Sequence, residues 1–183
     1  QLLTNWSGYE LLGIREPPAG TDWDLSLDLL GERGLGHGTT FTYQDNAFAP
    51  WSDRASGLVD FWAIDDHGED TLGEGRRGLE PAKDYRHKLF WRHRQDVLDD
   101  YRLSAEFGWL SDRNFLEEYF KREWDELKDM DTRAEFGQTR GNMSWDVSAQ
   151  ARINTFFTQT EWLPRGDHFW LGQPLLGESL TWY

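Results

Sequence analysis

The 183-residue sequence contains no cysteine, so it forms no disulfide framework of its own and no thiolate metal site. It also lacks any apolar run near the roughly 18 residues that a membrane-spanning helix requires. Basic residues are few, since 19 Lys and Arg stand against 33 Asp and Glu and give a net charge of −14. This balance argues against a nucleic-acid-binding protein, which normally carries a basic surface.

Aromatic residues are abundant, with 11 Trp, 11 Phe and 6 Tyr. In residues 23–29, 101–109 and 143–153, apolar side chains occupy every second position and alternate with polar ones. A period of two is typical of a strand with one apolar and one polar face. The pattern of residues 143–153 lasts as long as the strands of about 9–11 residues that cross a bilayer when tilted.

The alternation in residues 101–109 and 143–153 assigns a direction to each side chain. The apolar series is predicted to face lipid and comprises Leu103, Phe107, Trp109, Val147 and Ile153. Glu106, Asp146 and Arg152 belong to the polar series and are predicted to face an interior. Tyr101 and Trp109 bracket a smaller apolar middle, as the aromatic girdles of membrane strands do.

Residues 85–95 carry an unusual basic stripe for so acidic a chain. The stripe consists of Arg86, Lys88, Arg92 and Arg94 on one strand face, while Leu89 and Trp91 lie on the other. One interpretation is a solvated face whose cations pair with acids on neighbouring strands. The other is a stripe that faces a polar lumen and meets anionic groups. With Arg152, these four cations are the candidate substrate-path residues.

The glycine-rich segment 29–43 raises the question of a phosphate-binding loop. Gly31, Gly34, Gly36 and Gly38 have the spacing G-x-x-G-x-G-x-G and stand between two strand patterns. A dinucleotide-binding loop needs G-x-G-x-x-G before a helix, and a Walker loop needs G-K-[ST]. Neither occurs here, so the segment predicts a glycine-rich hairpin connection.

One segment, residues 111–129, departs from the strand pattern. Its apolar residues recur at intervals of three and four and are Phe115, Leu116, Tyr119, Phe120, Trp124 and Leu127. This spacing predicts an amphipathic helix in a loop between two strands, with Ser111 or Asp112 as its N-cap.

The sequence offers no clear active site. Glu117 and Glu118 are adjacent, so on a helix they point about 100° apart and do not flank one bond. Asp65, Asp66 and His67 favour the opening of a loop over a metal site. There is no G-x-S-x-G motif. We therefore expect a protein that is not an enzyme and that holds no metal and no cofactor.

Four segments occur in an order that resembles a known family. They are DLLGERGLGHGTTFTY, DDHGEDTLG with LFWRHRQ, GWLSDRNFLEEYFKREWDELKD, and ARINTFFTQTEWLPRGDHFWLGQPLL. Together they resemble the barrel of the outer-membrane lipopolysaccharide-assembly proteins, the LptD or organic-solvent-tolerance family. The pieces SDRNFLEEYF and NTFFTQTEWLP are the most specific, and Arg33–Gly38 matches the family's R-G-L-G-x-G hairpin, which would be a rim turn.

The resemblance implies a fold and a function. The fold would be all-β, with antiparallel strands of a large outer-membrane β-barrel and one short amphipathic helix in a loop. Residues 1–183 would be a fragment of about eight to ten strands, preceded in the family by a periplasmic jelly-roll domain. The function would be insertion of lipopolysaccharide, or a related amphiphilic glycolipid, into the outer leaflet. Implied partners are an LptE-like plug lipoprotein and periplasmic lipopolysaccharide-bridge proteins, and the implied location is the cell outer membrane.

Two alternatives remain open. A passive porin-type barrel shows the same alternation, because that pattern reports only lipid outside and water inside. A soluble carbohydrate-binding β-sandwich is also rich in Trp and in strands of alternating polarity. Both ends of the sequence have strand-like patterns, so we expect a piece of a longer protein.

Overall fold

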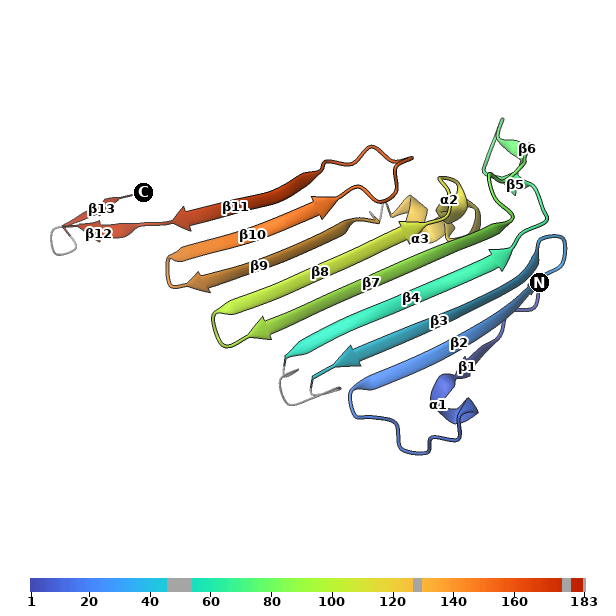
Figure 1. Ribbon diagram of the computed structural model, residues 1–183, viewed down its shortest axis with the longest axis horizontal. Coiled ribbons are helices and arrows are strands. Elements are labelled where there is room, and N and C mark those ends of the chain that lie inside the picture. The colour runs from blue at the N-terminus through green and yellow to red at the C-terminus, as the bar shows by residue number, and fades with distance from the viewer. Residues whose placement is uncertain (46–53, 127–129, 176–178, 183) are drawn as a thin grey trace.

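The computed structural model describes residues 1–45, 54–126, 130–175 and 179–182. Its main feature is a nine-stranded antiparallel sheet with the order β1-β2-β3-β4-β7-β8-β9-β10-β11 (Figure 1). The strands are β1 (Asn5–Ser7), β2 (Thr21–Leu30), β3 (Gly34–Gln44), β4 (Ala55–Asp65), β7 (Tyr85–Val97), β8 (Tyr101–Leu110), β9 (Thr132–Arg140), β10 (Met143–Ala151) and β11 (Trp162–Trp170). Because β1 and β11 stand at opposite edges, the sheet is open. The predicted all-β antiparallel fold is confirmed, in the open form that part of a barrel takes.

The remaining elements are short. They are the helices α1 (Gly8–Leu11), α2 (Phe115–Tyr119) and α3 (Lys121–Asp125), and the two-stranded sheets β5 (Asp70–Thr71) with β6 (Arg77–Leu79) and β12 (Gln173–Leu175) with β13 (Leu180–Trp182). In the described ranges, each helix is too short and too polar to traverse a bilayer.

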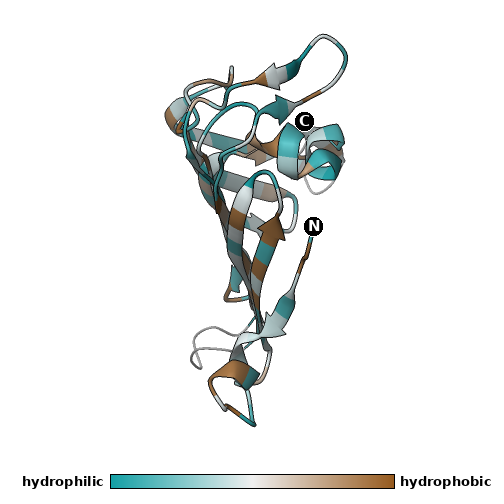
Figure 2. Ribbon diagram, turned by 90° about the vertical axis from the view of Figure 1, so that its right-hand side faces the viewer, coloured by the Kyte–Doolittle hydropathy of each residue, from teal (hydrophilic) through white to brown (hydrophobic). Residues whose placement is uncertain are grey.

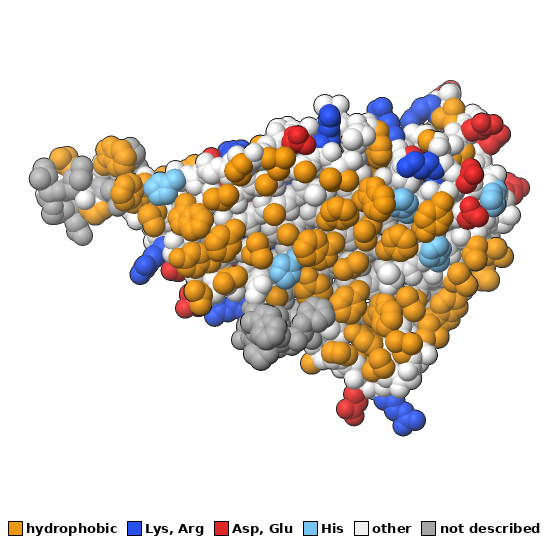
Figure 3. Space-filling view, in the orientation of Figure 1, with side chains coloured by type: hydrophobic (Ala, Val, Ile, Leu, Met, Phe, Trp, Pro, Cys, Tyr) orange, Lys and Arg blue, Asp and Glu red, His pale blue; other side chains and the backbone are white. Residues whose placement is uncertain are grey.

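The two faces of the main sheet differ in character. The strand register joins Leu89 to Trp109 and Trp91 to Phe107 on one face, and Arg92 to Glu106 on the other. We call the first the apolar face and the second the polar face. Figure 3 views the apolar face, where hydrophobic side chains spread across the strands and most charged side chains lie at the margins. The alternation within each strand thus produces one continuous apolar surface and one continuous polar surface, because the register places apolar side chains beside apolar ones and polar beside polar.

The predicted orientation of the strand residues can now be compared with their positions. Leu103, Phe107, Trp109 and Val147 share the apolar face, and the side chain of Val147 is 50% exposed. Glu106 and Asp146 share the polar face. The face that each residue occupies therefore follows the alternation in the sequence.

The strand predicted over residues 143–153 is two residues shorter than expected, because β10 ends at Ala151. Ile153 and Arg152 lie in the connection that follows, outside the alternating surface. Three residues past the strand end, the buried Asn154 side chain accepts from the backbone N–H of Leu110 at 2.9 Å and donates to the carbonyl of Met130 at 3.1 Å. These bonds hold Asn154 at the end of β8, so the chain leaves the path of β10.

The glycine-rich segment is only partly a turn. Residues 31–33 turn the chain, and Gly34 already begins β3. A β-carbon at Gly36 would lie 2.5 Å from Cζ2 of Trp62, and one at Gly38 would lie 2.8 Å from the carbonyl of Phe61. The predicted hairpin connection is confirmed, since β2 and β3 pair antiparallel around residues 31–33, but Gly34, Gly36 and Gly38 belong to β3 rather than to the turn. Two of them leave room on β3 for the indole of Trp62, which lies across them.

The predicted single helix over residues 111–129 is two short helices. Phe120 separates α2 from α3 with φ −126° and ψ 51°, which are not helical values. The break lets Phe120 reach the sheet, where its ring meets Trp62 edge-on at 5.6 Å between centroids. The N-cap prediction is also wrong, since α2 begins after Asn114 and Asp112 binds elsewhere. Leu127 lies outside the described residues.

The helices α2 and α3 stand on the polar side of the sheet, as Figure 2 shows for one end of the molecule. They cover a buried apolar cluster formed by Leu30, Ile64, Phe90, Leu110, Phe115, Leu116 and Met130. Phe120 and Trp124 pack against this cluster, so both rings are docked on the sheet. We call residues 111–126 the cap. The core thus lies under the cap rather than along the whole sheet.

Candidate functional site

The basic stripe of β7 is divided by its surroundings. Arg86 and Lys88 lie beneath the cap with 0% and 1% of their surface exposed, whereas Arg92 and Arg94 lie beyond the cap and are exposed. Lys88 Nζ is 2.8 Å from a carboxylate oxygen of Asp60 and 2.9 Å from one of Glu123. Half of the predicted stripe is therefore neutralised by acids in its own vicinity, and half faces an open surface.

Arg86 is the centre of a buried ion cluster. Its guanidinium donates to Asp66 at 2.9 Å, to Asp70 at 2.6 Å and to both oxygens of Asp112 at 2.9 Å. Arg33 donates to Asp66 at 2.8 Å and to Asp70 at 3.1 Å. Two guanidinium groups and three carboxylates thus tie together the turn before β3, strand β7, the loops after β4 and β8, and the start of β5.

Tyr119 brings the cap into this cluster. Its hydroxyl donates to Asp66 at 2.6 Å and accepts from Arg33 at 2.8 Å. Burial opposes ionisation of Asp66, but hydrogen bonds from Tyr119, Gly68 and Arg86 outweigh it and lower its pKa. The pKa of Asp112 is lowered in the same way, since bonds from Arg86 and Ser111 outweigh its burial. Both carboxyls therefore remain charged and bound at neutral pH.

The hairpin of β5 and β6 is fastened to the cap by the two adjacent glutamates. Glu117 pairs with Arg76 at 2.6 Å, and Glu118 accepts from the backbone N–H of Thr71 at 2.7 Å. The two carboxylates diverge, as their adjacency in the sequence predicted. Each therefore serves a separate attachment.

The segments that carry the family resemblance meet at this end of the sheet. Arg33 comes from RGLGHG, Asp66 and Asp70 from DDHGED, and Asp112 and Tyr119 from SDRNFLEEYF. The segment NTFFTQTEWLP adds Asn154, Phe156 and Phe157, which pack beside the cap or bind under it. Sequence reasoning did not assign these residues to a site. The sequence signal that could have indicated a site was the acidic and glycine-rich composition of these segments, but composition does not show which segments meet in the fold.

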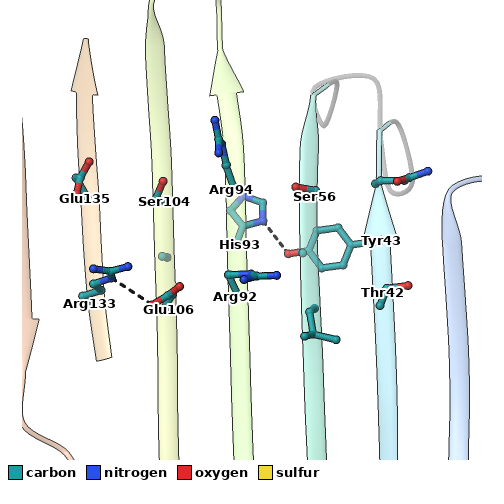
Figure 4. A pocket seen from close by; sticks show the side chains of 14 residues that line it. Thr42, Tyr43, Ser56, Arg92, His93, Arg94, Ser104, Glu106, Arg133 and Glu135 are labelled. Carbon is teal, nitrogen blue, oxygen red and sulfur yellow. Dashed lines mark hydrogen bonds and ion pairs between the residues drawn. The ribbon is translucent and has the colours of Figure 1, made fainter. Parts of the chain in front are cut away.

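Beyond the cap, the polar face is hollowed over β3, β4, β7, β8 and β9. The hollow has a volume of about 620 Å³ and is lined by residues of all five strands. Figure 4 shows Arg92, Glu106 and Arg133 in one row across neighbouring strands, with Arg94, Ser104 and Glu135 in the next. This hollow is the candidate site.

Some charged side chains in the hollow form ion pairs and others do not. Glu106 lies opposite Arg92 in the register, but it pairs with Arg133 on its other side at 3.2 Å. Within the described ranges, neither the Arg92 nor the Arg94 side chain forms a hydrogen bond or ion pair, and Arg94 has only a Coulombic interaction with Asp96. Two exposed guanidinium groups consequently line the hollow without a side-chain hydrogen bond or ion pair within the described residues.

A second hollow of about 420 Å³ adjoins the first and shares Glu135 with it. It is lined by residues at the far ends of β7, β8, β9 and β10, including Arg102 and Asp146. Arg102 is paired with Asp96 at 2.8 Å. The two hollows form a polar track that begins beside the cap and runs toward the opposite end of the strands.

Other predicted residues lie elsewhere. Arg152 is exposed in the connection after β10, where its backbone N–H donates to Glu161 at 3.0 Å, so it does not join the other four cations. Asp65 and His67 are exposed and 3.6 Å apart, while Asp66 points into the ion cluster. Among the residues that the structure describes, no group of three or more His, Asp or Glu side chains is arranged to hold a metal ion.

No protein-family model matches this chain, and no curated protein matches its sequence. The function is therefore argued from the site itself. Chemically, the hollow presents two unpaired guanidinium groups beside an ion pair and several hydroxyls. Guanidinium forks match the oxygens of phosphate and carboxylate groups, so this surface is suited to hold an anion.

Proposed function

We propose that this chain forms part of the wall of an outer-membrane translocon that inserts lipopolysaccharide, or a related anionic glycolipid, into the outer leaflet. The observation that supports the proposal most is the two-faced sheet. Eight of its nine strands have 9 to 13 residues, long enough for a bilayer's hydrocarbon region. In this proposal the apolar face meets lipid and the polar face lines the path.

The polar track gives the path its chemistry. Arg92 and Arg94 hold phosphate or acidic sugar groups by charge-assisted hydrogen bonds as they pass. The paired Glu106 and Arg133 keep the neighbouring wall neutral. Arg86 and Lys88 have a structural part instead, because their charges fasten the cap. The activity is transport rather than covalent chemistry, with a plug lipoprotein and periplasmic bridge proteins as the partners that the family resemblance implies.

A passive porin-type barrel is the second candidate, since a water-filled pore uses the same two-faced sheet. A β-sandwich is less suited to this structure. A sandwich packs two sheets of comparable size face to face, and the other sheets in the described residues have only two strands each.

Charge reversal in the hollow separates these functions. We expect Arg92→Glu with Arg94→Glu to lower surface lipopolysaccharide while the folded protein stays at its normal level in the membrane. The matched control is Lys121→Glu with Arg122→Glu, which changes the charge equally on the exposed side of the cap. Surface lipopolysaccharide is measured by labelling intact cells, and folded protein by its heat-dependent gel mobility.

The other outcomes are informative. Loss of the folded protein assigns Arg92 and Arg94 to wall stability. Normal surface lipopolysaccharide with a changed flux of small solutes identifies a passive pore. Normal values for lipid, solutes and folded protein remove the hollow from any transport path.

A further inference from the structure

Arg92 and Arg94 are spaced to share one small anion. They are two residues apart on the same face of β7, so their Cα atoms are about 7 Å apart along the strand. Both side chains are exposed and form no hydrogen bond or ion pair within the described residues, although Arg94 has a Coulombic interaction with Asp96. A phosphate group accepts hydrogen bonds from two guanidinium groups at once, since it presents several oxygens in different directions.

The hollow has an apolar border on the side of the cap. Leu58 lies directly opposite Arg92 in the register of β4 and β7 and also lines the hollow. The same leucine packs against the buried apolar cluster, whose member Phe90 precedes Arg92 by two residues on the polar face. An apolar group bound next to Arg92 can therefore contact Leu58 without leaving the hollow.

The acidic side chains determine on which side of the hollow an anion binds. Glu106 is compensated by Arg133, but Glu135 has no ion-pair partner in the parts of the chain that the structure describes. Glu135 lies two strands from Arg94, beyond Ser104. It repels an anion on that side, so an anionic group is held toward β7 and β4, where the apolar border is.

We infer that the hollow contains a binding subsite for a phosphate monoester that carries an alkyl chain. The phosphate lies between Arg92 and Arg94, and the first carbons of the chain contact Leu58. This inference rests on the proposed function and deepens it, because it states which part of an anionic amphiphile the wall holds and in which orientation.

The test measures binding of three small probes to the full-length protein folded in a neutral detergent. The probes are hexyl phosphate, inorganic phosphate and hexanol, each titrated by calorimetry. We expect hexyl phosphate to bind about tenfold more tightly than inorganic phosphate, the gain given by burial of about two methylene groups. Hexanol is expected to show no measurable binding, since the charged group supplies most of the affinity.

Variants assign the two parts of the subsite. Arg92→Gln with Arg94→Gln is expected to weaken both phosphate probes by at least about tenfold, because charge-assisted hydrogen bonds are lost. Leu58→Ala is expected to leave inorganic phosphate unchanged and to remove most of the advantage of hexyl phosphate. Arg122→Gln is the control, since Arg122 lies on the exposed side of the cap, paired with Glu126 and outside both hollows, and this variant should bind each probe as the parent does.

Three results overturn the inference. Equal binding of hexyl and inorganic phosphate leaves a simple anion site, and equal binding of hexyl phosphate and hexanol leaves a simple apolar pocket. Unchanged binding in the double arginine variant places the phosphate elsewhere. If the expected binding is found while charge reversal leaves surface lipopolysaccharide normal, the subsite stands and the transport proposal falls. If charge reversal impairs transport but no probe binds, the subsite falls and the transport proposal stands.

Discussion

The guanidinium of Arg86 and the carboxylate of Asp112 form two hydrogen bonds of 2.9 Å each, and they join strand β7 to the segment that leads into α2. Arg86 is fully buried and Asp112 almost so. An exposed pair of similar length exists on the same face, where Arg102 donates to Asp96 at 2.8 Å. The first pair is buried and has two hydrogen bonds, whereas the second is exposed and has one, so the cost of removing each carboxylate can be compared.

Asp112→Ala should destabilise the cap by about 3 kcal/mol, because it leaves a buried guanidinium short of a charged partner. Asp96→Ala, the matched exposed control, should cost less than about 1 kcal/mol, since water and salt screen that pair. The measurement is amide hydrogen exchange in residues 115–126 for the first variant and at the β7–β8 turn for the second. Similar costs at both sites would show that burial does not govern these ion pairs.

The docking of the cap depends on two aromatic side chains. Phe120→Ser with Trp124→Ser should weaken docking by about 3 kcal/mol, because two large apolar side chains no longer remove surface from water. We expect faster protease cleavage within residues 111–126 and little change in the amount of folded sheet. Helices as short as α2 and α3 are not stable alone in water, so the cap should unfold once it is released. Unchanged cleavage would mean that the ion cluster alone holds the cap.

Acid should also release the cap, because protonation of its carboxylate partners weakens the ion cluster. Asp66 and Asp112 have pKa values below the ordinary value of 3.8 in the folded protein. Groups with lowered pKa values stabilise the folded state fully above the unfolded pKa, and the stabilisation is lost as the pH falls through the folded pKa. The cap should therefore stay protected at pH 5 to 7 and open below about pH 4. Pepsin cleavage within residues 111–126 reports this opening at low pH.

A control identifies the carboxyls responsible. Asp112→Asn carries one fewer titrating carboxyl in the cluster, so the acid-dependent part of the opening should shrink even though the variant is less stable at neutral pH. The same acid-dependent change in this variant and the parent would assign the opening to groups outside the cluster.

An arginine introduced on the apolar face should lower the free energy of unfolding more than an arginine introduced on the polar face. Val147→Arg should cost about 2–4 kcal/mol if Val147 lies near the membrane midplane, and Ser148→Arg should cost much less. Val147 is central in β10 on the apolar face, and Ser148 follows it on the polar face. Denaturant unfolding from lipid vesicles measures both free energies. Equal costs would contradict the assignment of the apolar face to lipid.

Local pattern was sufficient to predict part of the sheet, namely the strands over residues 23–29, 85–95, 101–109 and 143–153 and the faces of their side chains. Alternation at Leu103, Phe107 and Val147 assigned each residue to its face before any tertiary contact was known, because side-chain direction in a strand repeats every two residues. The pattern failed where a distant segment competed with it. Asn154 ended β10 early by binding β8, and Phe120 broke the predicted helix to reach Trp62.

The sequence by itself determined that Arg86, Lys88, Arg92 and Arg94 share one face, since their even spacing requires it. Only the tertiary structure decided that the first two are structural and the last two are open. The carboxylates that neutralise Arg86 come from positions 16 to 26 residues away in the chain, on two loops and the start of β5, which meet Arg86 only when the sheet is formed. Coulombic attraction and burial depend on distances between such segments, and a local pattern does not contain those distances.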